Sequence, residues 1–171
     1  MVRQFEQPRH EDVALFVDLW QPDFPDQRQR ENVELALSYA ATLLTDACRG
    51  ANARLLLAVA ARDSAVKPGV ASRAYLDDAL ETLAAAQPSD APSLAGLVEQ
   101  ARLAIKAGCQ VVVISTRAIE APAALRSVAA GRLSLINVDA EEFAGRFSVP
   151  PVHESNKRSP LTAGKADGDD R

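Results

Sequence analysis

The chain has 171 residues, which is enough for one domain with a hydrophobic core of its own. Its formal net charge of -4 gives no basic surface for holding a polyanion, so nucleic-acid binding is disfavoured. The longest apolar runs, residues 55–61 and 111–114, are much shorter than the roughly 18 residues that cross a bilayer, and no secretion signal follows Met1. We therefore expect a cytoplasmic chain without a membrane segment.

The common kinds of zinc, hydrolase and nucleotide site have no signature in this sequence. The 2 cysteines, Cys48 and Cys109, lie in apolar surroundings without metal-ligand spacing, which predicts reduced core thiols. The 2 histidines, His10 and His153, lie outside the predicted core, so neither is placed to activate a serine or threonine. The sequence also lacks a nucleophile-elbow motif and a glycine-rich phosphate loop.

The first predicted elements are a strand, a loop and a helix. Residues 13–17 are continuously apolar and end in Asp18, which is the pattern of a strand buried on both faces of a parallel sheet. A proline-bracketed loop follows at residues 21–25. Asp26 is then placed to cap a helix whose apolar residues recur at three- and four-residue steps until Gly50.

A second strand and a second helix follow. Residues 53–60 predict another apolar strand. The turn signal Pro68-Gly69 then leaves room for only a short edge strand near residues 65–67. Ser72 opens a helix that carries three leucines on one face.

The remaining elements continue the alternation of helix and strand. A helix follows Pro92 and runs up to Gly108, residues 110–115 form a β-branched strand, residues 122–130 a short helix, and residues 133–138 a last strand. This spacing implies right-handed crossovers. The sequence therefore predicts an α/β fold of three layers, with a mainly parallel sheet of Rossmann-like topology and helices on both faces.

The C-terminal part of the chain differs in composition from the rest. Phe143 and Phe147 lie four residues apart and predict a final short helix. Residues 150–171 mix Pro, Ser, Lys, Gly and Asp without periodicity. We expect a domain of residues 1–148 and a disordered, dispensable tail of residues 149–171.

Several polar and aromatic residues are expected to converge at the carboxyl edge of the sheet, where the parallel strands end. The candidate interaction residues are Asp18, Trp20, Asp23, Ser89, Ser93, Thr116 and Arg117. The carboxylate and the hydroxyls suit oxygen ligation of Mg²⁺. Alternatively, the Asp18 carboxylate caps a neighbouring loop and the hydroxyls bond to their own backbone. Trp20 is either a core anchor or an exposed binding contact.

Four segments, in this order, resemble one protein family. They are residues 1–6 (MVRQFE), the strand ending in Asp18, the helical residues 30–41, and the strand at 55–60 with Arg62-Asp63 after it. Over roughly residues 1–147 the chain resembles the family known as domain of unknown function 58. The C-terminal part of that family is similar to von Willebrand factor type A domains, so the resemblance implies a type A-like fold.

The resemblance also implies that the metal-ion-dependent adhesion site of type A domains is degenerate here. The family pattern D-x-S-x-S reads Asp18-Leu19-Trp20-Gln21-Pro22, so both serines are replaced. Thr116 stands where a second aspartate is expected, and Arg117 adds a positive charge. We therefore expect no cofactor and no metal, with Mg²⁺ on Asp18 as the alternative.

Members of this bacterial family carry membrane-spanning helices upstream and commonly accompany MoxR-type AAA ATPases. The resemblance thus implies a non-enzymatic protein-interaction or adaptor module, with a MoxR-type ATPase as a candidate partner and a longer, membrane-anchored parent protein. Two alternatives stay open. One is a metal-dependent protein-binding domain that uses Asp18, and the other is a small α/β hydrolase or transferase acting through Asp18, Asp23 and Thr116. The oligomeric state does not follow from the sequence.

Overall fold

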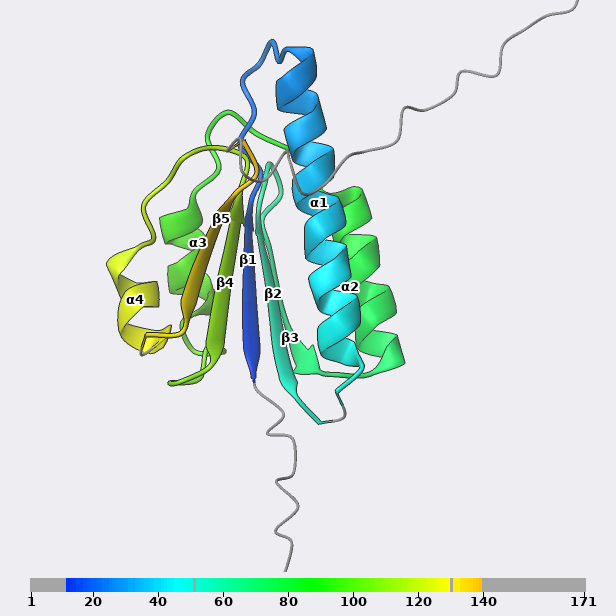
Figure 1. The fold of residues 1–171 in the computed structure, drawn as a ribbon, viewed down its shortest axis with the longest axis vertical. Coiled ribbons are helices and arrows are strands. Elements are labelled where there is room, and N and C mark those ends of the chain that lie inside the picture. Colours follow the sequence, from blue (N-terminus) through cyan, green and yellow to red (C-terminus); the bar gives the residue numbers. More distant parts are fainter. Residues whose placement is uncertain (1–11, 51, 130, 140–171) are drawn as a thin grey trace, which may run out of the picture.

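The apolar run after Asp12 forms the central strand of a five-stranded sheet (Figure 1). The structure is a computed structural model that describes residues 12–50, 52–129 and 131–139. The strands are β1 (Val13–Asp18), β2 (Arg54–Ala60), β3 (Ala65–Val70), β4 (Gln110–Ser115) and β5 (Leu133–Asn137). Their order across the sheet is β3-β2-β1-β4-β5, and every neighbouring pair is parallel except β2 and β3.

Within the described residues, two helices cover each face of this sheet. They are α1 (Gln27–Cys48) and α2 (Arg73–Ala85) on one face, and α3 (Leu94–Ala101) and α4 (Ala123–Ala129) on the other (Figure 1). Successive residues of β1 enter different cores, because side chains alternate along a strand. Leu15 packs in the core below α1 and α2, and Phe16 in the core below α3 and α4. The predicted three-layer, mainly parallel α/β fold is confirmed.

Side-chain caps start the helices where the sequence predicts them. Asp26 accepts a hydrogen bond from the Gln29 amide, and the Gln29 side chain accepts one from the Asp26 amide, which makes a complete capping box. Ser72 caps α2. The helix after Pro92 is shorter than predicted and ends at Ala101, because the residues that follow bury little: Leu103 is 101% exposed.

The edge strand β3 is longer than predicted and runs through Pro68 and Gly69. A proline is tolerated in an edge strand because one side of such a strand has no ladder partner. Gly69 lies under the ring of Tyr75, where an added Cβ would clash with a ring carbon. The Tyr75 hydroxyl donates to the carbonyl of Lys67 at 3.0 Å and fixes the ring there. The glycine therefore serves a close approach rather than a turn.

Other differences from the predicted elements are small. α1 ends at Cys48, two residues before Gly50, and β2, α4 and β5 are each one or two residues shorter than predicted. Cys48 and Cys109 are both free thiols. None of the helices in the described part of the chain is long and apolar enough to cross a membrane. The two histidines, the predicted helix around Phe143, the tail and the boundary at residue 148 lie outside the described residues.

Candidate functional site

The registers of β1 and β4 bring two polar side chains together where both strands end. Asp18 is the Cα partner of Ser115, and both are completely buried. The Ser115 hydroxyl donates a hydrogen bond of 2.9 Å to Asp18 Oδ2. The Arg117 amide donates in turn to the Ser115 hydroxyl at 3.2 Å. A buried carboxylate is therefore built into the centre of the sheet's carboxyl edge.

Among the described residues, the side chain of Arg117 is paired with the charge of Asp18. Arg117 Nε lies 3.4 Å from Asp18 Oδ2, and the arginine side chain is 37% exposed. The second carboxylate oxygen, Oδ1, is buried without a hydrogen-bond partner. Burial raises the pKa of Asp18, and the hydrogen bond from Ser115 and the charge of Arg117 lower it by less. Burial therefore disfavours the ionised form of Asp18, and the charge of Arg117 partly offsets this effect.

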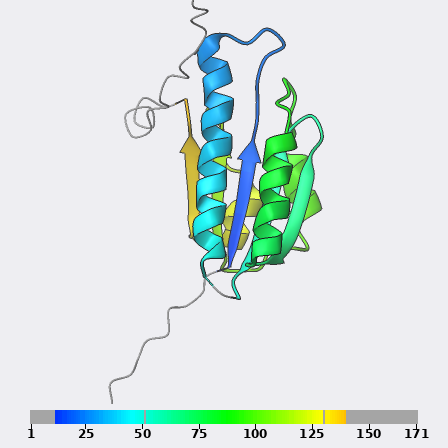
Figure 2. The ribbon, with the colours of Figure 1, turned by 90° about the vertical axis from the view of Figure 1, so that its right-hand side faces the viewer.

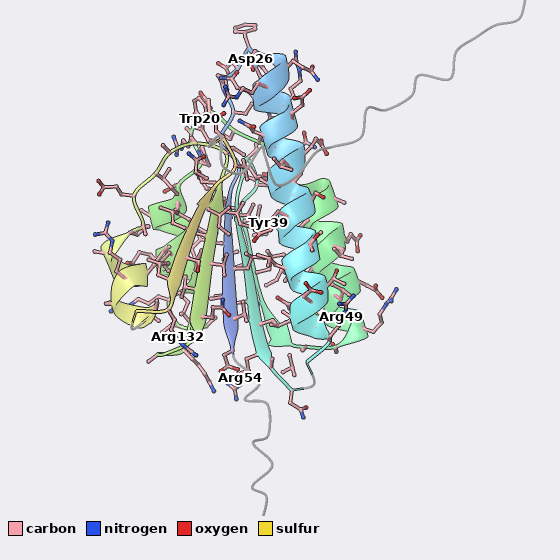
Figure 3. The ribbon with its side chains drawn as sticks, in the orientation of Figure 1. Trp20, Asp26, Tyr39, Arg49, Arg54 and Arg132 are labelled. Atoms are coloured by element: carbon pink, nitrogen blue, oxygen red, sulfur yellow. The ribbon has the colours of Figure 1, made fainter. Side chains whose placement is uncertain are left out.

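Trp20 is fixed at the same edge by contacts from two other segments. It forms an isolated parallel bridge with Ser89, and its indole Nε1 donates to the carbonyl of Asp90 at 2.9 Å. The Thr116 hydroxyl donates to the Trp20 carbonyl at 2.6 Å. Figure 3 shows Trp20 at the end of the sheet where Asp26 begins α1. The indole is held in one place although its side chain is only half-buried.

Arg117 also packs on the indole. Its guanidinium carbon lies 5.6 Å from the centroid of the Trp20 ring, a distance suited to a cation–π contact. One arginine therefore links the buried carboxylate of Asp18 to the aromatic surface above it. Neither alternative for Trp20, core anchor or exposed contact, describes this position fully, because the indole contacts Arg117 and Asp90 and is still partly exposed.

The structure brings together five of the seven candidate residues, namely Asp18, Trp20, Ser89, Thr116 and Arg117. The Ser93 hydroxyl accepts a hydrogen bond from the Gly96 amide and caps α3. It therefore bonds to its own local backbone, as the alternative to metal ligation describes. Asp23 is exposed in the loop before α1. Two residues escaped sequence reasoning. Asp90 contributes a backbone carbonyl, for which residue type gives no signal. Phe24 lies in the proline-bracketed loop and is 95% exposed, which the sequence pattern does not specify.

The donors at this edge fit Mg²⁺ poorly. The unpartnered Oδ1 of Asp18 is the one feature that suits a cation. However, Oδ2 already accepts from Ser115 and faces Arg117, whose charge repels a metal ion. Trp20 and Pro22 supply no side-chain oxygen. Among the described residues, no three His, Cys, Asp or Glu side chains form a group that could hold a metal.

Comparisons with known proteins add a likeness in structure. No protein-family model matches the chain, and no curated protein matches it. Among solved structures, a von Willebrand factor type A protein from Catenulispora acidiphila is similar, with 14% sequence identity and a TM-score of 0.45. The match covers 73% of this chain and 32% of that protein, so this chain spans about a third of its structural neighbour.

Proposed function

We propose that this chain is a non-enzymatic protein-interaction module with a type A-like fold. Its binding surface is the aromatic edge, defined by Trp20, Phe24, Ser89 and Arg117. The observation that carries the proposal is the Trp20–Arg117 pair, which is partly exposed and held at a fixed place by Ser89, Asp90 and Thr116. Tryptophan and arginine are the residue types that dominate interface energetics.

Rigidity supports the same proposal. A side chain that is ordered before binding loses little conformational entropy when a partner arrives. Backbone hydrogen bonds lock the loops on both sides of Trp20, from Gln21 to Ser89 at 2.9 Å and from Ser89 to Leu19 at 3.1 Å. Phe24, in the same loop, exposes nearly its whole side chain to solvent. An exposed aromatic in the loop that follows a fixed aromatic–arginine pair is suited to binding a protein.

The polar groups of the edge argue for binding rather than catalysis. The hydroxyl of Thr116 is committed to backbone carbonyls of β1 and of the loop after it. Asp18 is buried, and its ion pair with Arg117 is part of the fold. These contacts leave the indole of Trp20 and the side chain of Arg117 partly exposed, so the edge presents contact area instead of an activated nucleophile.

We further propose that the chain is a relative of the domain of unknown function 58 family and that its partner is a MoxR-type AAA ATPase. The support is the ordered resemblance of residues 1–6, 13–18, 30–41 and 55–63 to that family. In this role the chain is an adaptor, and the aromatic edge is the part that contacts the ATPase.

Replacing Phe24 with alanine should weaken binding of the MoxR-type ATPase from the same genome by about tenfold or more, because an exposed aromatic at a binding edge loses its contact area. Biolayer interferometry with the immobilised chain measures this change. Leu103→Ala is the matched control, since Leu103 is 101% exposed in the segment that follows α3. If the two variants bind the ATPase equally well, Phe24 is not part of the interface. If the unaltered chain does not bind the ATPase, this partner is excluded.

A divalent-metal-dependent binding domain is the second candidate, because Asp18 Oδ1 is buried without a partner. We expect millimolar Mg²⁺ to leave the melting temperature unchanged, since a ligand stabilises a protein only as far as its concentration exceeds its Kd. Differential scanning fluorimetry with Mg²⁺ and Mn²⁺ tests this. A rise of several degrees that Asp18→Ala abolishes would favour the metal-dependent alternative instead.

A further inference from the structure

The carboxylate of Asp18 is placed where it disfavours folding. It lies at the carboxyl end of β1 and is completely buried, between the uncharged residues Ala60 of β2 and Ser115 of β4. One of its two oxygens, Oδ1, has no hydrogen-bond partner in the described part of the chain. A neutral side chain of the same size would cost the fold less than a buried charge with an unpartnered oxygen. Such a group calls for a role other than stability.

The described contacts of Asp18 lead from the buried end of β1 to Arg117. Asp18 Oδ2 accepts a hydrogen bond from the Ser115 hydroxyl at 2.9 Å, and Arg117 Nε lies 3.4 Å from the same oxygen. The Arg117 amide donates to the Ser115 hydroxyl at 3.2 Å. The backbone and the side chain of Arg117 are therefore both tied to a carboxylate that the sheet encloses, one through Ser115 and the other directly.

The charged end of Arg117 has two contacts within the described part of the chain, the carboxylate of Asp18 and the indole of Trp20. Its guanidinium carbon lies 5.6 Å from the centroid of the indole ring. The Nε atom faces Asp18, and the terminal nitrogens make no hydrogen bond to a described residue. An arginine side chain has many rotamers, and an ionic contact at Nε selects among them. The terminal nitrogens stay available to donate to a partner.

We propose that Asp18 is a positioning residue for the aromatic edge: its buried carboxylate keeps Arg117 on the Trp20 ring, in the orientation that a partner protein contacts. This inference rests on the proposed function of that edge as a binding surface. Figure 2 shows β1 running directly into the loop that continues to α1, and Trp20 and Phe24 belong to this loop. The buried charge and the binding surface are thus neighbouring parts of one chain segment, and the charge serves binding at a cost in stability.

Asp18→Asn tests this role because it removes the charge and keeps the shape of the side chain. The full chain with this substitution should melt at the temperature of the unaltered chain or above it, because a buried amide costs less than a buried carboxylate. Arg117 is 37% exposed, so water can solvate its charge once the carboxylate is gone. If the melting temperature falls by about 5 °C or more, Asp18 stabilises the fold and the proposal is wrong.

Tryptophan fluorescence reports the position of Arg117 without any partner. Trp20 is the one tryptophan in the sequence, so the emission comes from this site alone. Asp18→Asn should move the emission maximum to longer wavelength by several nanometres, because the guanidinium leaves the ring and water replaces it. Asp12→Asn is the matched control, since Asp12 lies before the opposite end of β1 and is paired with Lys106 at 3.9 Å. Identical spectra of the two variants would contradict the proposal.

Binding of the MoxR-type ATPase to the full chain measures the consequence for the partner. Asp18→Asn should weaken it by about fivefold or more in biolayer interferometry, because Arg117 then has to be ordered on binding. Asp12→Asn should leave the affinity unchanged. Normal affinity of the Asp18→Asn variant would overturn the proposal. If the unaltered chain does not bind the ATPase, the proposed partner is wrong, and the emission shift and the melting temperature alone decide whether Asp18 positions Arg117.

Discussion

Replacing Arg117 with alanine should lower the free energy of unfolding at neutral pH by about 2 kcal/mol. The substitution leaves the Asp18 carboxylate buried with no cation beside it, and removing one member of a buried pair costs up to about 3–5 kcal/mol. The expected value is smaller because Arg117 is itself 37% exposed, so water already screens the pair. Guanidinium unfolding followed by circular dichroism measures the change.

A second substitution separates this cause from lost packing on Trp20. Asp18→Asn removes the buried charge, so Asp18→Asn/Arg117→Ala should regain most of the stability that Arg117→Ala loses. Arg126→Ala is the matched control, because Arg126 and its partner Glu120 are both largely exposed and their ion pair contributes little. If the double variant is no more stable than Arg117→Ala, the arginine acts through the indole instead of the carboxylate.

The pH dependence follows from the direction of the Asp18 pKa. Burial raises this pKa above its ordinary value of 3.8, so the folded state binds the proton more tightly than the unfolded state. Stability from this group is therefore fully present below pH 3.8 and is lost as the pH rises through the folded pKa. Arg117→Ala removes a cation that lowers the pKa and should extend the loss to higher pH. Its destabilisation should accordingly shrink as the pH is lowered.

Much of the fold was predictable because its signals are local. Continuous apolar runs mark β1, β2 and β4, whose residues are buried on both faces, and Asp26 and Ser72 mark helix starts through their own side chains. The course of β3 through Pro68 and Gly69 was not predictable. It depends on the ring of Tyr75, which comes from the next helix and is not visible in the local pattern of the strand.

The site was predictable in position and less so in detail. Parallel strands end at one edge, so the convergence of Asp18, Trp20 and Thr116 follows from topology. The pairing of Arg117 with both Asp18 and the indole depends on the rotamer of one long side chain. No sequence pattern specifies that rotamer, and none indicates that a backbone carbonyl of Asp90 receives the indole N–H.

Replacing Trp20 with alanine should weaken binding of the partner ATPase by about 30-fold or more while lowering the free energy of unfolding by only about 1–2 kcal/mol. A central interface tryptophan typically contributes 2 kcal/mol or more to binding. A fully buried tryptophan would cost about 3–5 kcal/mol of stability when truncated, but Trp20 is half-buried and makes an exposed hydrogen bond to Asp90. Interferometry and guanidinium unfolding on the same variant separate the two effects.

Phe16→Ala is the control for a purely structural role, because Phe16 is completely buried in β1 and cannot contact a partner. It should lower stability by about 3–5 kcal/mol and leave the affinity of the remaining folded chain unchanged. If Trp20→Ala behaves like Phe16→Ala, with a large stability loss and normal affinity, the indole is a core anchor. The aromatic edge would then lose its central contact, because Arg117 packs on that ring.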